Sequence, residues 1–312
     1  MMDLHHLRTF VAIADSGGVA RAAAKVNLSQ PAASRQMQAL EAELGVRLFD
    51  RVGRRVQLTS EAEDLLRRAR RLLADACSLR ERARALKSGR GGQIKIGATP
   101  PMIETVLASF LAKYRRRHPG IDINVVEDGG AGLIARLQRG EVHLAYVPVD
   151  DDRFAGRLLY PIHVMAAIPQ RHPLARFASL ELAKLADERL LLLNRSFASR
   201  VWFDAACETA NITANVRLES GAPNAVLALA AAGYGIAILP SMVRLAGKGV
   251  RAVALTHRGA AIGKWTRLAW DPQRFLAPYV QTFLEALVEH AQASYPGREL
   301  IRRAPPLRQP AA

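Results

Sequence analysis

The chain has 312 residues and half of them are hydrophobic, which is enough for two or three domains with buried cores. Its formal net charge is +16. Residues 1–92 hold 17 basic and 10 acidic side chains (+7), and the remaining 220 residues hold 27 and 18 (+9), so positive charge is denser near the N-terminus. This charge favours a polyanionic partner, although an arginine-rich composition explains part of it.

The cysteine content and the hydropathy of the chain argue against a disulfide-rich protein, a cysteine-ligated metalloprotein and a membrane-spanning protein. Cys77 and Cys207 lie far apart, so the sequence offers neither a disulfide framework nor a metal-ligand spacing. The N-terminal residues do not resemble a signal peptide, and no stretch is long and apolar enough to span a bilayer. We therefore expect a cytoplasmic protein that binds no metal, no cofactor and no membrane.

Residues 20–44 have the pattern of two short helices joined by a tight turn. Ser29 is a candidate N-cap for the second helix, Pro31 suits its first turn, and Gly45 suits a left-handed C-cap. An apolar stripe recurs at helical spacing within it. Its members are Ala33, Met37, Leu40 and Leu44.

The opposite face of this second helix carries Gln30, Ser34, Arg35 and Gln38, which are hydrogen-bonding groups without an acid among them. Base edges and phosphates require such groups. An ordinary amphipathic helix with a solvated polar face is the alternative. The flanking segments favour the DNA-binding interpretation, because a helix around residues 7–14 precedes the pair and a basic β-hairpin at 48–58 follows it.

At this point the chain resembles the LysR-type transcriptional regulators. The matching residues are Leu7-Arg8-Thr9-Phe10, Ala22-Ala23, Leu28-Ser29-Gln30-Pro31-Ala32, Ser34-Arg35-Gln36, Leu40-Glu41, Leu44-Gly45, Leu48-Phe49, Arg51 and Leu58-Thr59. The resemblance implies a winged helix-turn-helix in residues 1–59. It implies DNA contacts from Ser29, Gln30, Pro31, Ser34, Arg35 and Gln38, and from Arg51, Arg54 and Arg55 of the wing. Gly18 stands where the family usually has a serine, so a helix N-cap is expected to be missing.

Residues 60–88 predict one long helix. Ser60 and Glu63 have capping-box spacing. From Ala62 onward, apolar residues alternate in steps of three and four, and such a seam needs a partner helix, most simply from a second copy. A long helix lying on its own domain is the alternative. The predicted dimerisation residues are Leu65, Ala69, Leu72, Ala76, Leu79, Ala83 and Leu86.

A glycine-rich hinge at 89–92 then leads into an alternating strand and helix pattern, typical of an α/β domain with a largely parallel sheet. Strands are expected near 94–97, 121–126, 142–147, 163–168, 189–193, 216–219, 236–239 and 264–270. Helices are expected near 102–117, 131–139, 179–186, 199–210, 222–232 and 276–291. The proline-rich segment 294–312 is expected to be disordered.

The C-terminal part also resembles the family's effector domain, which is similar to a type 2 periplasmic binding protein. The resemblance rests on Ile96-Gly97, His118-Pro119, Leu137 with Gly140-Glu141, Pro169 with His172-Pro173-Leu174, Ala232-Gly233 with Gly235-Ile236, and Pro240. It implies an effector domain over 93–293 made of two α/β subdomains, about 93–162 with 265–293, and about 163–264.

The cleft between the two subdomains is expected to bind a small effector, for which we expect a small organic acid. Ligands of open α/β sheets sit beyond the carboxyl ends of strands and near free helix amides, and Thr99 has such a place. The expected cleft residues are Thr99, Pro100, Pro101, Gly129, Gly130, Val147, Pro148, Asn194, Phe197, Arg200 and Gly221. Any of these has a plain structural alternative, such as a flexible turn at Gly129 or a surface position at Arg200.

The sequence thus predicts a transcriptional regulator that reads double-stranded DNA as a homodimer or tetramer, responds to a small molecule and acts on RNA polymerase. The main alternative is a small-molecule binding protein without specific DNA recognition. A nonspecific nucleoid-type protein and an enzyme on a binding-protein fold are further alternatives. No nucleophile elbow, phosphate loop or pair of catalytic acids supports the enzyme, so no catalytic residue is predicted.

Overall fold

The structure is a computed structural model that describes residues 3–52, 55–88, 92–148, 153–245 and 249–309. The chain divides into two compact units, Met1–Lys87 and Ser88–Ala312, and each is described by itself. None of the helices in these described ranges has both the length and the apolar character needed to cross a bilayer.

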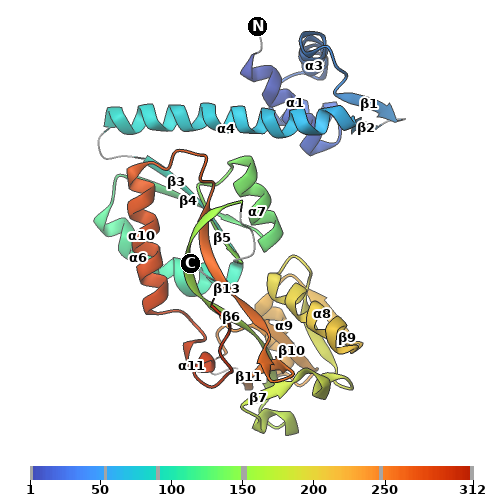
Figure 1. The fold of residues 1–312 in the computed structure, drawn as a ribbon, viewed down its shortest axis with the longest axis vertical. Coiled ribbons are helices and arrows are strands. Elements are labelled where there is room, and N and C mark those ends of the chain that lie inside the picture. The colour runs from blue at the N-terminus through green and yellow to red at the C-terminus, as the bar shows by residue number, and fades with distance from the viewer. Residues whose placement is uncertain (1–2, 53–54, 89–91, 149–152, 246–248, 310–312) are drawn as a thin grey trace. The chain divides into compact units, whose positions relative to one another are not determined.

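The N-terminal unit is a helix-turn-helix followed by a two-stranded hairpin and a long helix (Figure 1). Phe10, Ala22, Met37 and Leu40 meet in one buried cluster, which also takes in Leu48 from the start of the hairpin. The elements are α1 (Leu4–Ser16), α2 (Val19–Lys25), α3 (Gln30–Leu44), β1 (Phe49–Val52), β2 (Arg55–Leu58) and α4 (Ser60–Ser88).

The ends of α3 are fixed as the sequence predicts. The Ser29 hydroxyl accepts a hydrogen bond from the Ala32 amide (3.3 Å), and Gly45 ends the helix with φ of 69°. At that positive φ glycine is favoured, because it lacks the Cβ that clashes in other residues. Gly18 is the N-cap residue of α2 and has no side chain to cap the helix. This confirms the expectation that α2 lacks the serine cap usual in the family.

The start of α4 differs from the prediction. The capping group is Thr59, whose hydroxyl accepts from the Ala62 amide (3.2 Å). Ser60 is instead the first helical residue, and its hydroxyl donates to Glu61 (2.9 Å). The predicted Ser60–Glu63 capping box is therefore wrong: the cap lies one position earlier, and Ala62, at the third position after it, has no carboxylate to complete a box.

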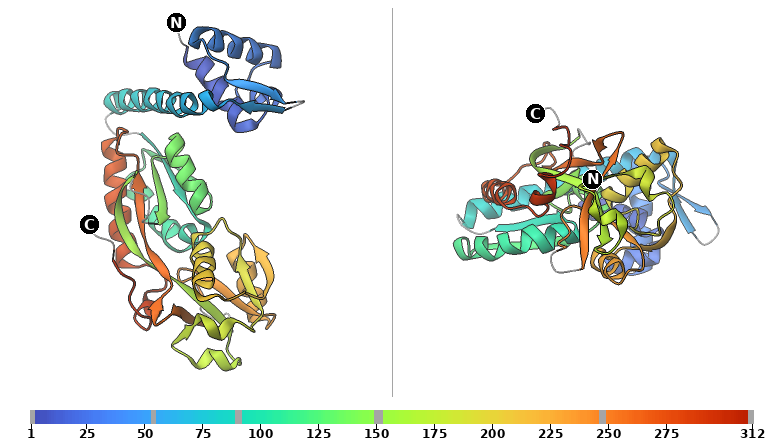
Figure 2. Two further views of the ribbon diagram at one scale, coloured as in Figure 1. Left: turned by 45° about the vertical axis from the view of Figure 1, so that its right-hand side comes forward. Right: turned by 90° about the horizontal axis from the view of Figure 1, so that it is seen from below.

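The C-terminal unit has two lobes joined by one twisted sheet (Figure 2). We call residues 92–163 with 263–293 lobe I, and residues 164–262 lobe II. In lobe I, β4, β3 and β5 are parallel, and β13 joins them antiparallel. The elements of lobe I are β3 (Gly92–Ala98), α5 (Pro100–Met102), the π-helix η1 (Ile103–Leu107), α6 (Ala108–Arg117), β4 (Ile121–Glu127), α7 (Gly130–Arg139), β5 (Leu144–Pro148), β13 (Gly263–Trp270) and α10 (Pro278–Ala293).

Lobe II repeats this plan, with β9, β8 and β10 parallel and β6 antiparallel to β10. Its sheet is covered on one face by α8 and on the other by α9. The elements are β6 (Ala155–Pro169, shared with lobe I), η2 (Pro173–Arg176), β7 (Ser179–Glu181), η3 (Leu182–Leu185), β8 (Leu190–Leu193), α8 (Ala198–Ala210), β9 (Val216–Ser220), α9 (Pro223–Ala231), β10 (Ile236–Pro240), β11 (Val250–His257) and β12 (Ala260–Ala261).

The chain crosses between the lobes twice. β6 pairs with β13 up to His163 and with β10 and β11 from Val164 onward. The return crossing is at Gly263, whose φ is +153° and where an added Cβ would lie 2.1 Å from the Ile162 carbonyl oxygen. Glycine at this position lets the two crossing strands approach closely.

Two expectations about the C-terminal unit are wrong. The helix expected at 179–186 is the strand β7 followed by the short 3-10 helix η3. The tail from residue 294 is ordered through residue 309: it contains α11 (Arg298–Ile301), Tyr295 stacks on Tyr160 with ring centroids 4.9 Å apart, and Leu300 joins a buried cluster. The packing of Tyr295 and Leu300 orders the tail, and its proline content does not reveal this packing.

The tail is also tied to the crossing strands by hydrogen bonds. The carbonyl of Pro305 lies 3.1 Å from His163 Nε2, and Trp265 donates to the carbonyl of Leu307 (3.4 Å). His163 is fully buried, and this burial lowers its pKa. A neutral imidazole that donates from Nε2 fits this environment.

Candidate functional sites

The polar face of α3 is open to solvent. Ser29, Gln30, Arg35 and Gln38 are exposed, as is Pro31, and Ser34 is half-buried. Within the described residues, the side chains of Gln30, Ser34, Arg35 and Gln38 form no hydrogen bond or ion pair. Their donors and acceptors are therefore available for an external partner.

The opposite face of α3 is fixed in the domain. Ala33, Met37 and Leu40 are buried against α1 and α2. Gln36, which belongs to the family pattern, accepts a hydrogen bond from the Thr9 hydroxyl at 2.6 Å. This contact sets the rotation of α3 about its own axis, so the polar face is presented by a rigid support.

The wing is a hairpin, with Phe49 opposite Leu58 and Val52 opposite Arg55. Its basic tip is predicted to contact DNA. Arg54 lies outside the described residues, and so do the side chains of Arg51 and Arg55. Their contact with DNA stays a prediction.

The long helix α4 has two apolar stripes with different surroundings. Ala62, Leu66 and Ala69 are buried in the core of their own unit, as the alternative interpretation supposes, so Ala69, which the sequence places in the dimer seam, packs within its own unit instead. Along the predicted seam, Leu65 and Ala76 are half-buried and Ala83 is exposed. Leu72 and Leu79 leave 44% and 69% of their surface exposed. Leu86 lies where side chains are not described.

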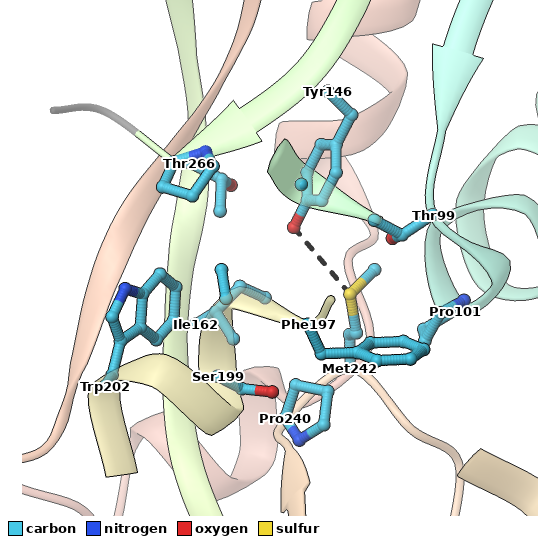
Figure 3. A pocket seen from close by; sticks show the side chains of 13 residues that line it. Thr99, Pro101, Tyr146, Ile162, Phe197, Ser199, Trp202, Pro240, Met242 and Thr266 are labelled. Carbon is cyan, nitrogen blue, oxygen red and sulfur yellow. Dashed lines mark hydrogen bonds between the residues drawn. The ribbon is translucent and has the colours of Figure 1, made fainter. Parts of the chain in front are cut away.

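In the second unit, a pocket lies between the lobes beyond the carboxyl ends of β3, β5 and β10 (Figure 3). The pocket and the open solvent at its mouth together span about 440 Å³. Its lining is mostly apolar and aromatic. It comprises Thr99, Pro101, Gly130, Tyr146, Pro148, Ile162, Phe197, Ala198, Ser199, Trp202, Pro240, Met242 and Thr266.

Most of the polar side chains in this pocket carry hydroxyls, and Trp202 adds an indole N–H. The Tyr146 hydroxyl donates to Met242 Sδ at 3.7 Å, drawn as a dashed line in Figure 3, and burial raises the pKa of Tyr146 to about 12. Tyr146 is therefore neutral at physiological pH. Because a thioether is a weak acceptor, this hydroxyl can exchange it for a ligand oxygen at little cost. The Thr266 hydroxyl already donates to the Tyr160 carbonyl (2.7 Å).

Of the predicted cleft residues, Thr99, Pro101, Gly130, Pro148 and Phe197 line this pocket. Pro100, Gly129, Val147, Asn194, Arg200 and Gly221 are not in its lining. Val147 is fully buried against α7, because successive strand residues point to opposite faces and Tyr146 and Pro148 take the cleft side. Sequence reasoning missed Tyr146 and Met242, although it noted the nearby Val147 and Pro240.

Arg200 has a structural role in place of the expected ligand contact. It is 6% exposed, and its three donor nitrogens bond to Asp204 Oδ1, the Leu193 carbonyl and Glu219 Oε1, each at 2.7 Å. These contacts tie α8 to β8 and β9. Each nitrogen of its guanidinium thus donates within lobe II, and Arg200 is not among the lining residues of the pocket.

The expected supply of free amides beside Thr99 is also smaller than predicted. The first two residues of α5 are Pro100 and Pro101, which have no N–H to offer. Met102 carries the first amide of this turn, and the Ile103 amide bonds to the Thr99 carbonyl (3.0 Å). A second helix, α8, begins at the pocket with Ala198 and Ser199, and its first amides are further donors beside the side-chain hydroxyls.

The two lobes touch directly at the rim of the cleft. The Gly130 amide donates to the Ser196 carbonyl (3.1 Å), and Asn224 Nδ2 donates to both oxygens of Glu104 (3.2 and 3.3 Å). An added Cβ on Gly129 would lie 2.5 Å from the Ser196 carbonyl oxygen. Gly129 therefore permits close approach of the lobes.

Metal and thiol chemistry find little support in the described ranges. No group of three or more metal-ligating side chains is present there. Cys207 is buried in lobe II, and burial raises the pKa of its thiol to about 11, so it is protonated at neutral pH. Cys77 is exposed on α4.

A capped helix with an open polar face, a hairpin wing and a separate two-lobed pocket define a DNA-binding regulator with a ligand-binding domain. Residues 4–63 match the model of the bacterial regulatory helix-turn-helix proteins of the lysR family, and residues 87–292 match the model of the LysR substrate binding domain. The chain belongs to the LysR family of transcriptional regulators.

Individual proteins that are similar to this chain are also transcriptional regulators. The transcriptional regulator IlvR of Caulobacter vibrioides is 30% identical over 298 residues, covering 94% of this chain and 99% of that protein. YybE of Bacillus subtilis, an uncharacterised HTH-type regulator, is 28% identical over 294 residues, covering 93% and 99%. The full-length structure of an OxyR variant from Pseudomonas aeruginosa superposes with a TM-score of 0.65 at 22% identity, covering 94% and 98%, which shows the fold. The protein is thus a DNA-binding transcriptional regulator whose activity is modulated by an effector.

Proposed function

We propose that this regulator binds its operator as a dimer in the cytoplasm, with α3 of each copy in the major groove, and that a small neutral molecule in the cleft changes its action on RNA polymerase. The observation that carries the first part is the open polar face of α3, whose Gln30, Ser34, Arg35 and Gln38 have no partner within the described residues. Catalysis is not part of the proposal, since its named relatives are regulators.

Arg35→Ala tests the recognition helix. A bidentate contact to a base is worth about 1–3 kcal/mol of discrimination, so the preference for a duplex selected from a random library over a random duplex should fall about 5- to 150-fold. Folding should be spared, because Arg35 is exposed. Fluorescence anisotropy at fixed salt measures both affinities.

The matched control is Arg217→Ala, which removes an exposed arginine from β9 in the other unit. It should bind both duplexes as the wild type does. If Arg35→Ala discriminated as well as the wild type, α3 would not be the reading element.

The effector class follows from the lining of the cleft. Among the described lining residues there is no lysine, arginine or histidine, so a carboxylate would find no positively charged side chain. Burying an unpaired charge among Tyr146, Phe197, Trp202 and Met242 is costly. We therefore propose a compact, mostly apolar ligand whose oxygen accepts from Tyr146, in place of the organic acid expected from the sequence.

Methyl NMR of methionine-labelled protein tests this class with isobutanol and isobutyrate, which share a carbon skeleton. Isobutanol should shift the Met242 methyl resonance with saturation, and isobutyrate should shift it at least about tenfold more weakly, because the carboxylate must shed its hydration without a counter-charge. Met242→Leu assigns the resonance. A stronger response to isobutyrate, or no response to either, would contradict the proposal.

A further inference from the structure

A second hollow lies between the C-terminal tail and lobe II, where α11 runs beside β11 (Figure 1). We call it the tail groove. The groove and the open solvent at its mouth together span about 1630 Å³. It shares no lining residue with the cleft. It is therefore a separate and larger site.

The tail groove carries a strong positive charge. Arg244, Arg251, Arg298 and Arg303 line it against one acid, Glu299, which gives four minus one, or +3. All four arginines are exposed. In the described part of the chain, none of their guanidiniums has a carboxylate within ion-pair distance.

The contacts that these arginines do make leave most of their donors free. Arg244 reaches the Thr105 carbonyl at 3.4 Å, and Arg298 reaches the Ala293 carbonyl at 3.2 Å. Each guanidinium has five N–H donors, in a fork that fits carboxylate and phosphate oxygens. The repulsion among like charges around one hollow is relieved by an anion.

The floor of the tail groove is apolar. Met165 and Val250 are buried at its base, and Val243 and Leu300 pack in the same cluster. Tyr295 and Pro296 of the tail complete the wall. A hydrated inorganic ion would leave this apolar surface exposed to water, whereas the hydrocarbon or aryl part of an organic ligand would bury it.

We propose that the tail groove binds an organic anion with an apolar body, its carboxylate or phosphate head held by the arginines. This site goes beyond the effector cleft. The segment after β10 separates the two sites, with Pro240 and Met242 facing the cleft and Ser241 and Val243 facing the tail groove. Thr105 of lobe I also lines it, so the occupant contacts both lobes.

Two methionines make the test specific to each site: Met165 lines the tail groove and Met242 lines the cleft. Methionine-methyl-labelled full-length protein is titrated with octanoate, octyl phosphate and octanol. We expect a saturable shift of the Met165 methyl with one or both anions, and the stronger of the two identifies the preferred head group. Octanol should bind at least about tenfold more weakly, because it lacks the charge that the arginines pair with.

The double variant Arg251→Gln/Arg303→Gln should weaken anion binding at least about tenfold, and Arg217→Gln should leave it unchanged. Arg244→Gln/Arg298→Gln, which removes the other two charges, gives an independent repeat, and circular dichroism checks that each variant is folded. Equal binding of octanol, undiminished anion binding by both double variants, a response at Met242 without one at Met165, or no response to either anion would overturn the proposal.

Discussion

Arg200→Ala is expected to destabilise the effector domain by about 3 kcal/mol, because removing one member of a buried charge network leaves the others without partners. The side chain is 6% exposed and bonds to Asp204, Glu219 and the Leu193 carbonyl. Asp204 and Glu219 keep 22% and 49% of their side chains exposed, so water recovers part of the loss. The expected loss is therefore at the lower end of the range for buried pairs.

Differential scanning calorimetry of the full chain measures this effect as a fall of about 6–12 °C in the melting temperature of the effector domain. Arg195→Ala is the matched control: Arg195 also pairs with Asp204 (3.2 Å), but its side chain is 77% exposed. It should change stability by no more than about 0.5 kcal/mol. An unchanged melting temperature in Arg200→Ala, together with loss of effector response, would instead make Arg200 a ligand-binding residue.

Leu72→Glu/Leu79→Glu should separate the proposed dimer and lower operator affinity by about 10²–10⁴-fold, because two linked reading heads bind far more tightly than one. Leu79 leaves 69% of its surface exposed and Leu72 leaves 44%, while Ala62 and Ala69 of the same helix are buried in their own unit. Apolar residues exposed along a helix at this spacing indicate a partner helix.

Analytical ultracentrifugation and anisotropy measure both parts of this prediction. Arg71→Glu is the control, since Arg71 is exposed on α4 but lies off the apolar seam. It should remain dimeric. A Leu72→Glu/Leu79→Glu variant that sediments as the wild type does would show that the exposed leucines are merely solvated and that the copies associate elsewhere.

The N-terminal unit can be predicted closely from the sequence because its signals are local. Ser29, Gly45 and the stripe Ala33–Met37–Leu40 depend on chemistry within a few residues, and the structure has them where the sequence predicts them. The hairpin at 49–58 follows in the same way. Propensity and capping act over one helical turn, so one sequence suffices to read them.

The cleft can be predicted only to within a residue or two, because its lining depends on which face of each strand turns inward. Val147 and Tyr146 are adjacent in β5 but point to opposite faces of the sheet. Val147 packs against α7, and Tyr146 lines the pocket. Knowing that a strand ends at the cleft does not reveal which of its residues point into the pocket and which point away from it. Met242 follows β10, and its part in the pocket depends on both lobes.

Contacts between residues far apart in the sequence determine the position of the Arg200 side chain and the order of the C-terminal tail. The resemblance predicts that Arg200 lines the cleft. In the structure its guanidinium instead pairs with the carboxylate of Glu219 on β9. The prolines of the tail predict disorder, yet its order comes from contacts with Tyr160 and His163, which lie far back in the chain. Such pairings cannot be read from local composition.

Hydroxyl-radical footprinting on a selected operator is the most direct test of the central proposal, that two copies of α3 enter successive grooves of one duplex. The proposal predicts two protected half-sites on one face of the DNA, their centres about 10–10.5 base pairs apart or a whole multiple of that spacing, and both lost in Arg35→Ala. A single protected half-site, or uniform protection unaffected by Arg35→Ala, would contradict it.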